Sequence, residues 1–278
     1  MNEATILVNG EPASTVSVFD RGFQFGDGLF ETIPVYRGVP LLWERHLARL
    51  ARGAARLGIV APSPDLLTSE AQRLCAAGGD GRAVIKIILT RGIGTRGYAA
   101  DSASAPTRVV YRTPWPDYPA ESARDGVSLH VCDTPLSGNP RLAGIKHLNR
   151  LEQVLARAEW RNEHADGIMC HDGNVIEGTR SNVFIVADQM LRTPDVSACG
   201  VEGVMRAVVL ETASRLGIRC EVARLTLADL DQASEIFITN SLIGAWPVRH
   251  VRARNYSVGP VTRTIQEAIR ESHCFDRD

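Results

Sequence analysis

The sequence predicts an α+β protein of two domains. Runs of β-branched residues bounded by turn residues alternate with segments whose apolar side chains recur every three or four positions. With 278 residues, the chain is long enough for two cores of ordinary size. Three prolines stiffen residues 114–119, which is typical of a linker. We therefore expect an N-terminal α/β domain at residues 1–114, a linker at 115–124 and a larger C-terminal domain at 125–278.

The composition argues against several classes of protein. Hydrophobic residues make up 44% of the chain, charged residues 23%, and the formal net charge is −1. These values are ordinary for a globular protein and indicate neither a nucleic-acid nor a membrane partner. No basic segment followed by an apolar one opens the chain, so we expect a cytoplasmic protein. The six cysteines lack a C-x-x-C pair and predict neither a disulfide framework nor a metal site.

The predicted N-terminal domain begins with a short strand at residues 6–10 and a glycine-punctuated loop at residues 21–31. A hairpin follows at residues 32–42. The best-defined helix covers residues 43–57, with its apolar positions on one face. The opposite side is either a solvated basic face or includes one arginine that points into a phosphate site. These arginines are Arg45, Arg49, Arg52 and Arg56.

A second helix at residues 65–77 and two strands at residues 83–90 and 107–113 complete this domain. The loop between the strands, residues 91–98, contains three glycines and two arginines. It is either a clamp for a substrate carboxylate or a flexible surface loop.

The C-terminal domain is predicted to combine many strands with few helices. Asp172 and Gly173 form a typical hairpin dipeptide, and residues 226–229 resemble a capping box. Apolar periodicity predicts helices at residues 208–216 and 261–272. Strands are expected at residues 126–133, 166–171, 174–178, 182–187, 220–225, 235–240 and 247–251.

Three features of this domain are candidates for binding. Glu177 lies near the end of an apolar strand, where it is either exposed or paired in a site, because burying a lone carboxylate is costly. Glycines at 200 and 203 precede a helix, whose first N–H groups can then hold a phosphate. The hydroxyls of Thr239 and Ser241 at a strand end serve either a phosphate or a turn.

Lys146 opens a further helical pattern, with apolar residues on one face from Leu148 to Ala158. Pro140 and Gly144 interrupt regular structure upstream, so we expect Lys146 at or just before the first turn of a half-buried helix. The positive potential there favours a neutral amine, which carbonyl chemistry requires. The alternative is a solvated lysine at a helix start.

Taken together, several segments occur in an order that resembles the fold-type IV pyridoxal-phosphate enzymes. The similarity covers nearly the whole chain. It implies a homodimer with pyridoxal 5'-phosphate as cofactor, a small N-terminal α/β domain, and a larger C-terminal domain with a mixed, barrel-like sheet. The matching segments are Phe25-Gly-Asp-Gly-Leu-Phe-Glu31, His46-Leu-Ala-Arg49-Leu50, Lys146-His-Leu-Asn-Arg-Leu-Glu-Gln-Val154, Glu177-Gly-Thr-Arg-Ser-Asn182, Gly203-Val-Met-Arg206 and Thr239-Asn-Ser241.

The resemblance implies a role for each matching residue. Lys146 would bond covalently to the cofactor and then move the substrate proton. Glu177 would pair with the pyridine nitrogen and keep it protonated. The phosphate would be held by the Arg49 side chain, the backbone N–H groups of Val204 and Met205, and the hydroxyl of Ser241.

Within the family, the resemblance is strongest to the aminodeoxychorismate lyases. Branched-chain aminotransferases carry a tyrosine where this chain has Leu151, and of the carboxylate-binding residues of D-amino acid aminotransferases only Arg96 agrees. The arginine- and glycine-rich loop fits the lyases, which form 4-aminobenzoate and pyruvate. Arg96 and Tyr98 are then candidates for a substrate carboxylate, and Thr32 for protonating the leaving group. An aminotransferase of the same fold, or a non-catalytic binding protein, is the alternative.

Overall fold

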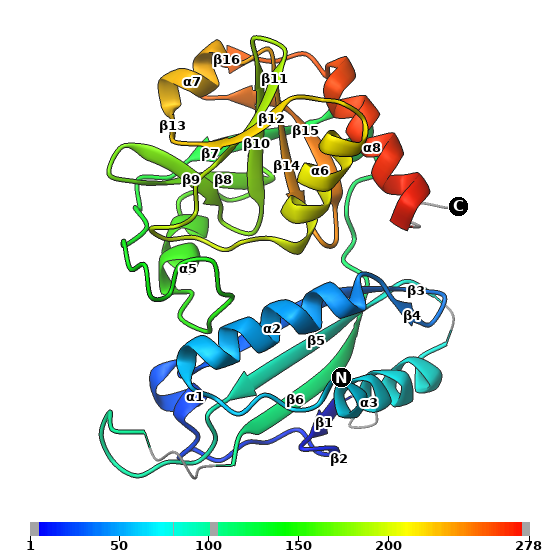
Figure 1. Cartoon of the computed structure of the whole chain (residues 1–278), viewed down its shortest axis with the longest axis vertical. Coiled ribbons are helices and arrows are strands. Elements are labelled where there is room, and N and C mark those ends of the chain that lie inside the picture. Colours follow the sequence, from blue (N-terminus) through cyan, green and yellow to red (C-terminus); the bar gives the residue numbers. More distant parts are fainter. Residues whose placement is uncertain (1–5, 80, 101–104, 274–278) are drawn as a thin grey trace. The chain divides into compact units, whose positions relative to one another are not determined.

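The computed structural model describes residues 6–79, 81–100 and 105–273. Cys274, one of the six cysteines, therefore lies outside the described residues. The chain forms two compact units (Figure 1). Unit 1 contains the described residues up to Pro116 together with Ile145–Asn149, and unit 2 contains Asp117–Gly144 and the described residues from Arg150 onwards. The two units confirm the α+β class, and the Lys146 segment belongs to the first of them.

Unit 1 is built on an antiparallel sheet with the strand order β2-β1-β6-β5-β3-β4. Its centre pairs β3 with β5 and β5 with β6 over eight residues each, so the register of the three strands is fixed. The strand β3 begins at Gly28, which pairs with Thr90. It is therefore longer than the strand predicted for the hairpin at residues 32–42. The strands are β1 (Ile6–Val8), β2 (Glu11–Pro12), β3 (Gly28–Tyr36), β4 (Val39–Pro40), β5 (Ala83–Thr90) and β6 (Thr107–Pro114).

Two helices cover one face of this sheet, α2 (Trp43–Leu57) and α3 (Pro64–Ala77) (Figure 1). Both were predicted, α2 from its apolar periodicity. Gly53 of α2 lies so close to Leu29 of β3 that an added Cβ would approach its side chain to 2.9 Å. A short helix, α1 (Arg21–Phe25), replaces part of the loop predicted at residues 21–31, because the side chain of Asp20 caps its first turn.

Unit 2 is built on a mixed sheet with the order β12-β11-β10-β14-β15-β7-β8-β9-β13, and β16 pairs with β15. Neighbouring strands are antiparallel except at the β11–β12, β15–β7 and β7–β8 pairs. The predicted hairpin turn at Asp172 and Gly173 is confirmed, and both residues have positive φ angles. The strands are β7 (Val127–Val131), β8 (Asp166–His171), β9 (Asn174–Gly178), β10 (Asn182–Ala187), β11 (Met190–Pro194), β12 (Cys220–Ala223), β13 (Leu225–Thr226), β14 (Glu235–Asn240), β15 (Gly244–Val251) and β16 (Arg254–Asn255).

The helices of unit 2 pack on this sheet, and its strands contribute to a core of mainly aliphatic side chains that also includes Trp246 and Tyr256. The capping box predicted at residues 226–229 is present, with Thr226 and Asp229 bonding each other's backbone N–H groups. The helices are α4 (Glu121–Asp125), α5 (Leu151–Arg157), α6 (Val204–Arg215), α7 (Leu227–Gln232) and α8 (Pro260–His273).

The prediction for the helix after Lys146 was wrong in two respects. The helix α5 begins only at Leu151, so Lys146 lies five positions before it and outside the first turn, where a helix dipole acts. The side chains of Leu151, Val154 and Leu155 are 70%, 61% and 55% exposed rather than half buried. The reason is that the backbone of residues 146–148 pairs with β3, and those sheet hydrogen bonds override the helical preference of the sequence.

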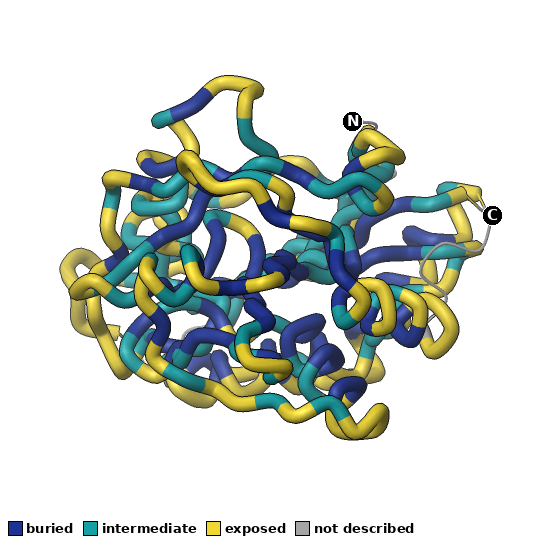
Figure 2. Tube along the Cα trace, turned by 90° about the horizontal axis from the view of Figure 1, so that it is seen from above, coloured by how far each residue is buried: buried dark blue, intermediate teal, exposed yellow. Residues whose placement is uncertain are grey.

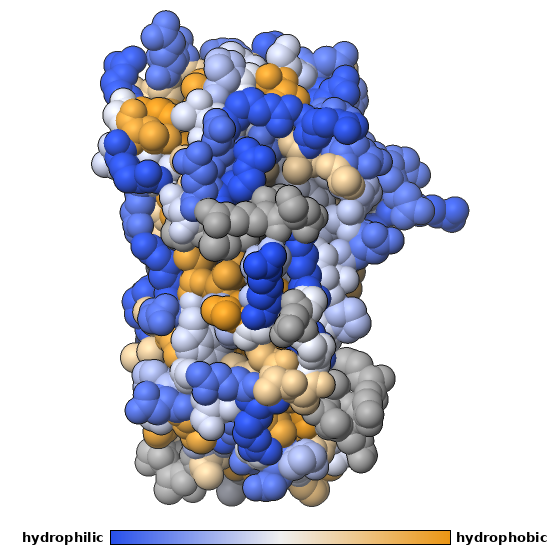
Figure 3. Space-filling model, turned by 90° about the vertical axis from the view of Figure 1, so that its right-hand side faces the viewer, coloured by the Kyte–Doolittle hydropathy of each residue, from blue (hydrophilic) through white to orange (hydrophobic). Residues whose placement is uncertain are grey.

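Burial follows the expected pattern in both units. Buried stretches lie mainly in the interior of the trace, and exposed stretches lie mainly along its outer loops (Figure 2). On the molecular face drawn in Figure 3, hydrophobic residues form small patches within a largely hydrophilic surface. Among the described residues, no helix is long and apolar enough to cross a membrane.

Candidate active site

Lys146 is held in an extended segment at the edge of the unit 1 sheet. Its backbone carbonyl accepts a hydrogen bond from the Phe30 N–H at 3.0 Å, and the Leu148 N–H donates to the Gly28 carbonyl at 2.9 Å. The Lys146 Nζ lies 4.4 Å from the centre of the Phe30 ring. The backbone hydrogen bonds on both sides of residue 147 therefore hold the Lys146 backbone in place. The Lys146 amine lies against an aromatic ring.

A buried cluster of charged and polar residues connects β3 with α2. The carboxylate of Glu31 is 1% exposed and accepts hydrogen bonds from Arg49 Nε at 2.8 Å and Arg49 Nη2 at 2.5 Å. His46 Nδ1 lies 2.6 Å from the same carboxylate. Although burial would raise the pKa of Glu31, the charge and hydrogen bonds of Arg49, with those of His46, lower it to about 2. Glu31 is therefore ionised at neutral pH.

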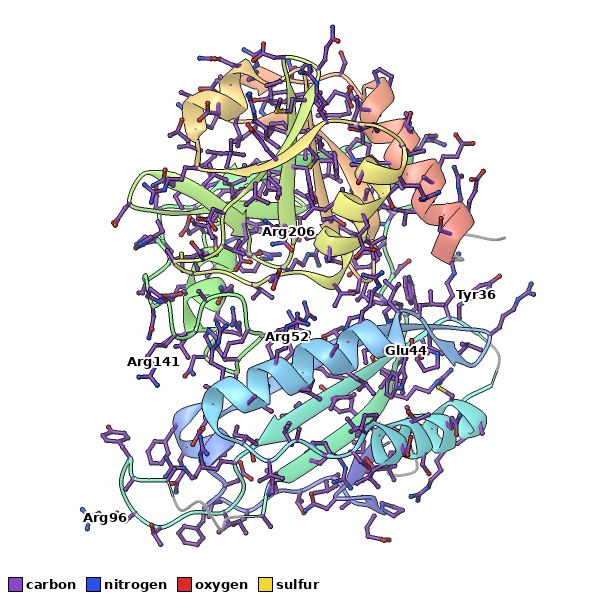
Figure 4. The ribbon with its side chains drawn as sticks, viewed as in Figure 1. Tyr36, Glu44, Arg52, Arg96, Arg141 and Arg206 are labelled. Atoms are coloured by element: carbon purple, nitrogen blue, oxygen red, sulfur yellow. The ribbon has the colours of Figure 1, made fainter. Side chains whose placement is uncertain are left out.

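Arg49 is the arginine of the predicted basic face that turns inward. It is 6% exposed, whereas Arg45, Arg52 and Arg56 on the same helix are exposed; Figure 4 shows Arg52 on the outside of α2. Burial lowers the pKa of the His46 ring. The other ring nitrogen of His46, Nε2, is buried without a hydrogen-bond partner among the described residues.

Arg96 and Tyr98 lie on the exposed loop that follows β5. Tyr98 is 87% exposed, and its ring packs edge-on against Phe25. The guanidinium of Arg21 bonds the carbonyls of Gly97 and Tyr98 at 3.0 and 3.1 Å and so ties the loop to α1. Figure 4 shows Arg96 at the outer end of this loop, pointing away from the strands of unit 1.

In unit 2, Glu177 is a buried residue of β9 rather than an exposed strand end. It is 4% exposed, and its Oε2 accepts a hydrogen bond from the Val201 N–H at 2.8 Å. The half-buried guanidinium of Arg150 lies within electrostatic range of this carboxylate. The alternative of an exposed strand end is therefore wrong, because Glu177 is buried and accepts a backbone hydrogen bond.

The start of α6 has the features of an anion cradle. Its N-cap is Gly203, and within the described residues no capping side chain accepts a hydrogen bond from the first N–H groups of the helix. A Cβ at Gly203 would lie 2.0 Å from Asn182 Oδ1, which shows how closely the backbone passes β10. Asn182 in turn donates to the Val201 carbonyl at 2.9 Å. The Val204 and Met205 side chains are buried beneath this turn.

The polar side chains at the strand end, residues 239–241, differ in whether they stabilise the turn. The Thr239 hydroxyl donates to the Gly244 carbonyl, and the Asn240 carboxamide accepts from the Leu242 N–H, so both stabilise the turn. Ser241 is half buried, and its hydroxyl makes no hydrogen bond within the described chain. Of the three, Ser241 has its hydroxyl available for a ligand.

Sequence reasoning missed two members of the unit 1 cluster and a second lysine. Glu31 follows Phe30 in β3, and His46 and Arg49 are three positions apart on α2, a spacing that puts both on one helix face. This spacing, together with a carboxylate in an otherwise apolar strand, was the pattern in the sequence that could have predicted the cluster. Lys86 interrupts the apolar strand β5 in the same way.

These features can be compared with known proteins. The sequence pattern described as amino-transferase class IV matches residues 28–251. The aminodeoxychorismate lyase of Vibrio harveyi is 39% identical over 265 residues, which cover 93% of this chain and 97% of that protein.

Solved structures show the same similarity. The crystal structure of 4-amino-4-deoxychorismate lyase from Pseudomonas aeruginosa superimposes with a TM-score of 0.92 and 46% identity, covering 96% of this chain and 98% of that one. The PLP-bound form of a hypothetical aminotransferase from Mycobacterium tuberculosis has a TM-score of 0.83 and 27% identity, with coverage of 96% and 97%.

Proposed function

Because the chain belongs to the amino-transferase class IV family, we propose that it is a pyridoxal-phosphate-dependent lyase that forms 4-aminobenzoate and pyruvate from 4-amino-4-deoxychorismate, a reaction of folate biosynthesis. The observation that carries the proposal is the similarity to two aminodeoxychorismate lyases over nearly the whole chain, which exceeds that to the aminotransferase. An aminotransferase of D-amino acids or branched-chain amino acids is the alternative within the family.

The residues present fit pyridoxal phosphate. The uncapped start of α6, at Val204 and Met205, supplies backbone donors for a phosphate, and the Ser241 hydroxyl adds one more. We assign the remaining phosphate charge to Arg49 and the pyridine nitrogen to Glu177, a buried carboxylate that the Val201 N–H holds in place. When bound, pyridoxal phosphate withdraws electrons from the carbon that carries the substrate amine.

The chain's own residues then have defined tasks. The Lys146 amine takes the proton from the amine-bearing carbon of the substrate, and its fixed backbone limits the positions that the amine reaches. The bond between the neighbouring ring carbon and the enolpyruvyl oxygen breaks, and the ring becomes aromatic. The leaving enolpyruvate needs one proton to become pyruvate. Thr32, half buried on β3 two positions after Phe30, is our candidate for supplying it.

The decisive experiment incubates the purified holoenzyme with synthetic 4-amino-4-deoxychorismate and follows 4-aminobenzoate by fluorescence and pyruvate by lactate dehydrogenase coupling. We expect the two products in equal amounts. D-alanine and L-leucine are tested in parallel for conversion of the cofactor to its amine form. An enzyme that makes no 4-aminobenzoate but converts its cofactor with an amino acid is an aminotransferase, and the lyase proposal is then wrong.

The proposal extends to a homodimer in the cytoplasm. Three apolar side chains of α5, at Leu151, Val154 and Leu155, are exposed in the single chain, and a second copy would remove them from water. Five described cysteines are free thiols, as expected in a reducing compartment. Light scattering should give twice 30.3 kDa for the purified protein. A monomer that is fully active would contradict the dimer.

A further inference from the structure

Asn182 ends the segment that begins at Glu177, and the proposed reaction gives it no task. It is the first residue of β10, and it is 5% exposed. Its side-chain nitrogen Nδ2 donates to the carbonyl oxygen of Val201 at 2.9 Å. Burying a carboxamide is costly unless it is hydrogen-bonded. The backbone group that Asn182 holds therefore indicates what this residue does.

The backbone of Val201 is held on both sides. Its N–H donates to Glu177 Oε2 at 2.8 Å, and its carbonyl accepts the hydrogen bond from Asn182. The residues before and after Val201 each bond the backbone of Gly144, at 2.9 and 3.1 Å. All of these residues belong to unit 2. Residues 200–202 are therefore fixed by directional hydrogen bonds, and two of the groups that fix them are the side chains of Glu177 and Asn182.

This segment leads directly into the proposed phosphate site. Gly203 follows Val201 by two positions and is the N-cap of α6, whose first residues are Val204 and Met205. A Cβ added at Gly203 would overlap the side-chain oxygen of Asn182. Asn182 therefore contacts both the backbone held at Val201 and the turn that places the first N–H groups of α6.

The strand β10 also connects Asn182 with the third group assigned to the phosphate. Asn182 pairs with Thr239 of β14, and Ser241 follows Thr239 by two positions. Asn182 is therefore linked, through one or two contacts, to the segments that carry Glu177, the start of α6 and Ser241.

We propose that Asn182 is a positioning residue that keeps Glu177 and the start of α6 at a fixed separation. The inference rests on the proposed function, which assigns Glu177 to the pyridine nitrogen and the α6 N–H groups to the phosphate. Both groups of pyridoxal phosphate are attached to one rigid ring, so their partners must keep a constant spacing. Asn182 acts on this spacing through the backbone of Val201, and not on the substrate.

The test compares the wild type with Asn182→Leu, which keeps the approximate shape of the side chain and removes its donor. The matched control is Thr193→Val. The Thr193 hydroxyl is buried in the same sheet and donates to the Val183 carbonyl at 2.8 Å, outside the segments assigned to the cofactor. Each variant thus loses one buried hydrogen bond to a backbone carbonyl, and urea unfolding verifies that it is folded.

Three properties of the bound cofactor are measured. Fluorescence titration gives the dissociation constant of pyridoxal phosphate, and phosphorus NMR reports on the phosphate. The wavelength of the visible absorption band depends on the protonation of the ring and so reports on Glu177.

We expect Asn182→Leu to weaken cofactor binding about 10-fold, to move the phosphorus signal and to shift the visible band. Thr193→Val should lose similar stability but resemble the wild type in all three properties. In a Glu177→Gln background, Asn182→Leu should no longer shift the band, because the charge that it positions is gone. If Asn182→Leu does not fold, Asn182→Ser, which is smaller and polar, is measured in its place with the same expectation.

Wild-type values of all three properties in the folded Asn182 variant overturn the inference. A weaker affinity with an unchanged band also overturns it, because only the phosphate end would then depend on Asn182. Equal changes in Thr193→Val would show a merely structural role and contradict the inference too. In each case an active wild type leaves the proposed function intact. A wild type that binds no pyridoxal phosphate overturns the proposed function, and the inference with it.

Discussion

Replacing Glu31 by glutamine tests whether the buried carboxylate holds the Arg49 side chain in place. Glutamine has the shape of glutamate but no charge, so the guanidinium of Arg49 would remain buried beside a neutral group. Removing one partner of a buried ion pair typically costs about 3–5 kcal/mol. The lowering of the Glu31 pKa from 4.5 to about 2 corresponds to roughly 3 kcal/mol, which agrees with that range.

The pH dependence gives this prediction a specific form. A carboxyl group whose pKa is lowered in the folded state stabilises the fold above its unfolded pKa, and this contribution is lost as the pH falls through the folded value. The stability difference between wild type and Glu31→Gln should therefore be complete above about pH 4.5 and shrink toward pH 2.

Urea unfolding of the apoprotein, followed by circular dichroism at several pH values, measures this difference. Glu44→Gln, in the exposed first turn of the same helix (Figure 4), is the control and should change the free energy of unfolding by less than about 1 kcal/mol. Equal stability of Glu31→Gln and the wild type at pH 7 would refute the role of Glu31. The phosphate role of Arg49 predicts in addition that Glu31→Gln weakens pyridoxal-phosphate binding.

Three further predictions concern residues assigned to the cofactor. Lys146→Ala should lose the visible absorption band that borohydride bleaches. Because Lys86 lies against the same ring, the double variant Lys146→Ala/Lys86→Met is the reference protein without either amine. A bleachable band in that double variant would contradict the assignment of Lys146. Glu177→Gln keeps an acceptor for the Val201 N–H but no charge, so turnover should fall on the order of 100-fold with the cofactor still bound; unchanged turnover would argue against pairing with the pyridine nitrogen. Gly203→Ala brings a Cβ within 2.0 Å of Asn182 and should weaken cofactor binding at least ~10-fold in a fluorescence titration, whereas Gly81→Ala, where a Cβ meets open space, should not.

Local patterns in the sequence predicted much of the fold. The helix Trp43–Leu57 and the strands β5 and β10 follow directly from apolar periodicity and β-branched runs. The hairpin at Asp172 follows from its turn dipeptide. These elements are determined by interactions between residues close in sequence, which is the information that a single sequence carries.

The candidate site depended more on contacts that are distant in sequence. Lys146 lies on an extended segment because β3, more than a hundred residues earlier, supplies its hydrogen bonds. Glu31 and Arg49 meet because a strand and the following helix pack together, and neither residue alone indicates this pairing. The resemblance to a family identified Arg49 and Glu177, whereas the Glu31 cluster and Lys86 became visible only in three dimensions.

The scarcity of lysine in this chain has a practical consequence. A protein grown with lysine labelled with ¹⁵N at its side-chain nitrogen carries only two labelled amines, and both lie beside the Phe30 ring. Ring currents should move both signals away from their usual positions. Each state of the proposed catalytic cycle would then be reported by two resonances, one for Lys146, the proposed covalent lysine, and one for Lys86, without any further substitution in the protein.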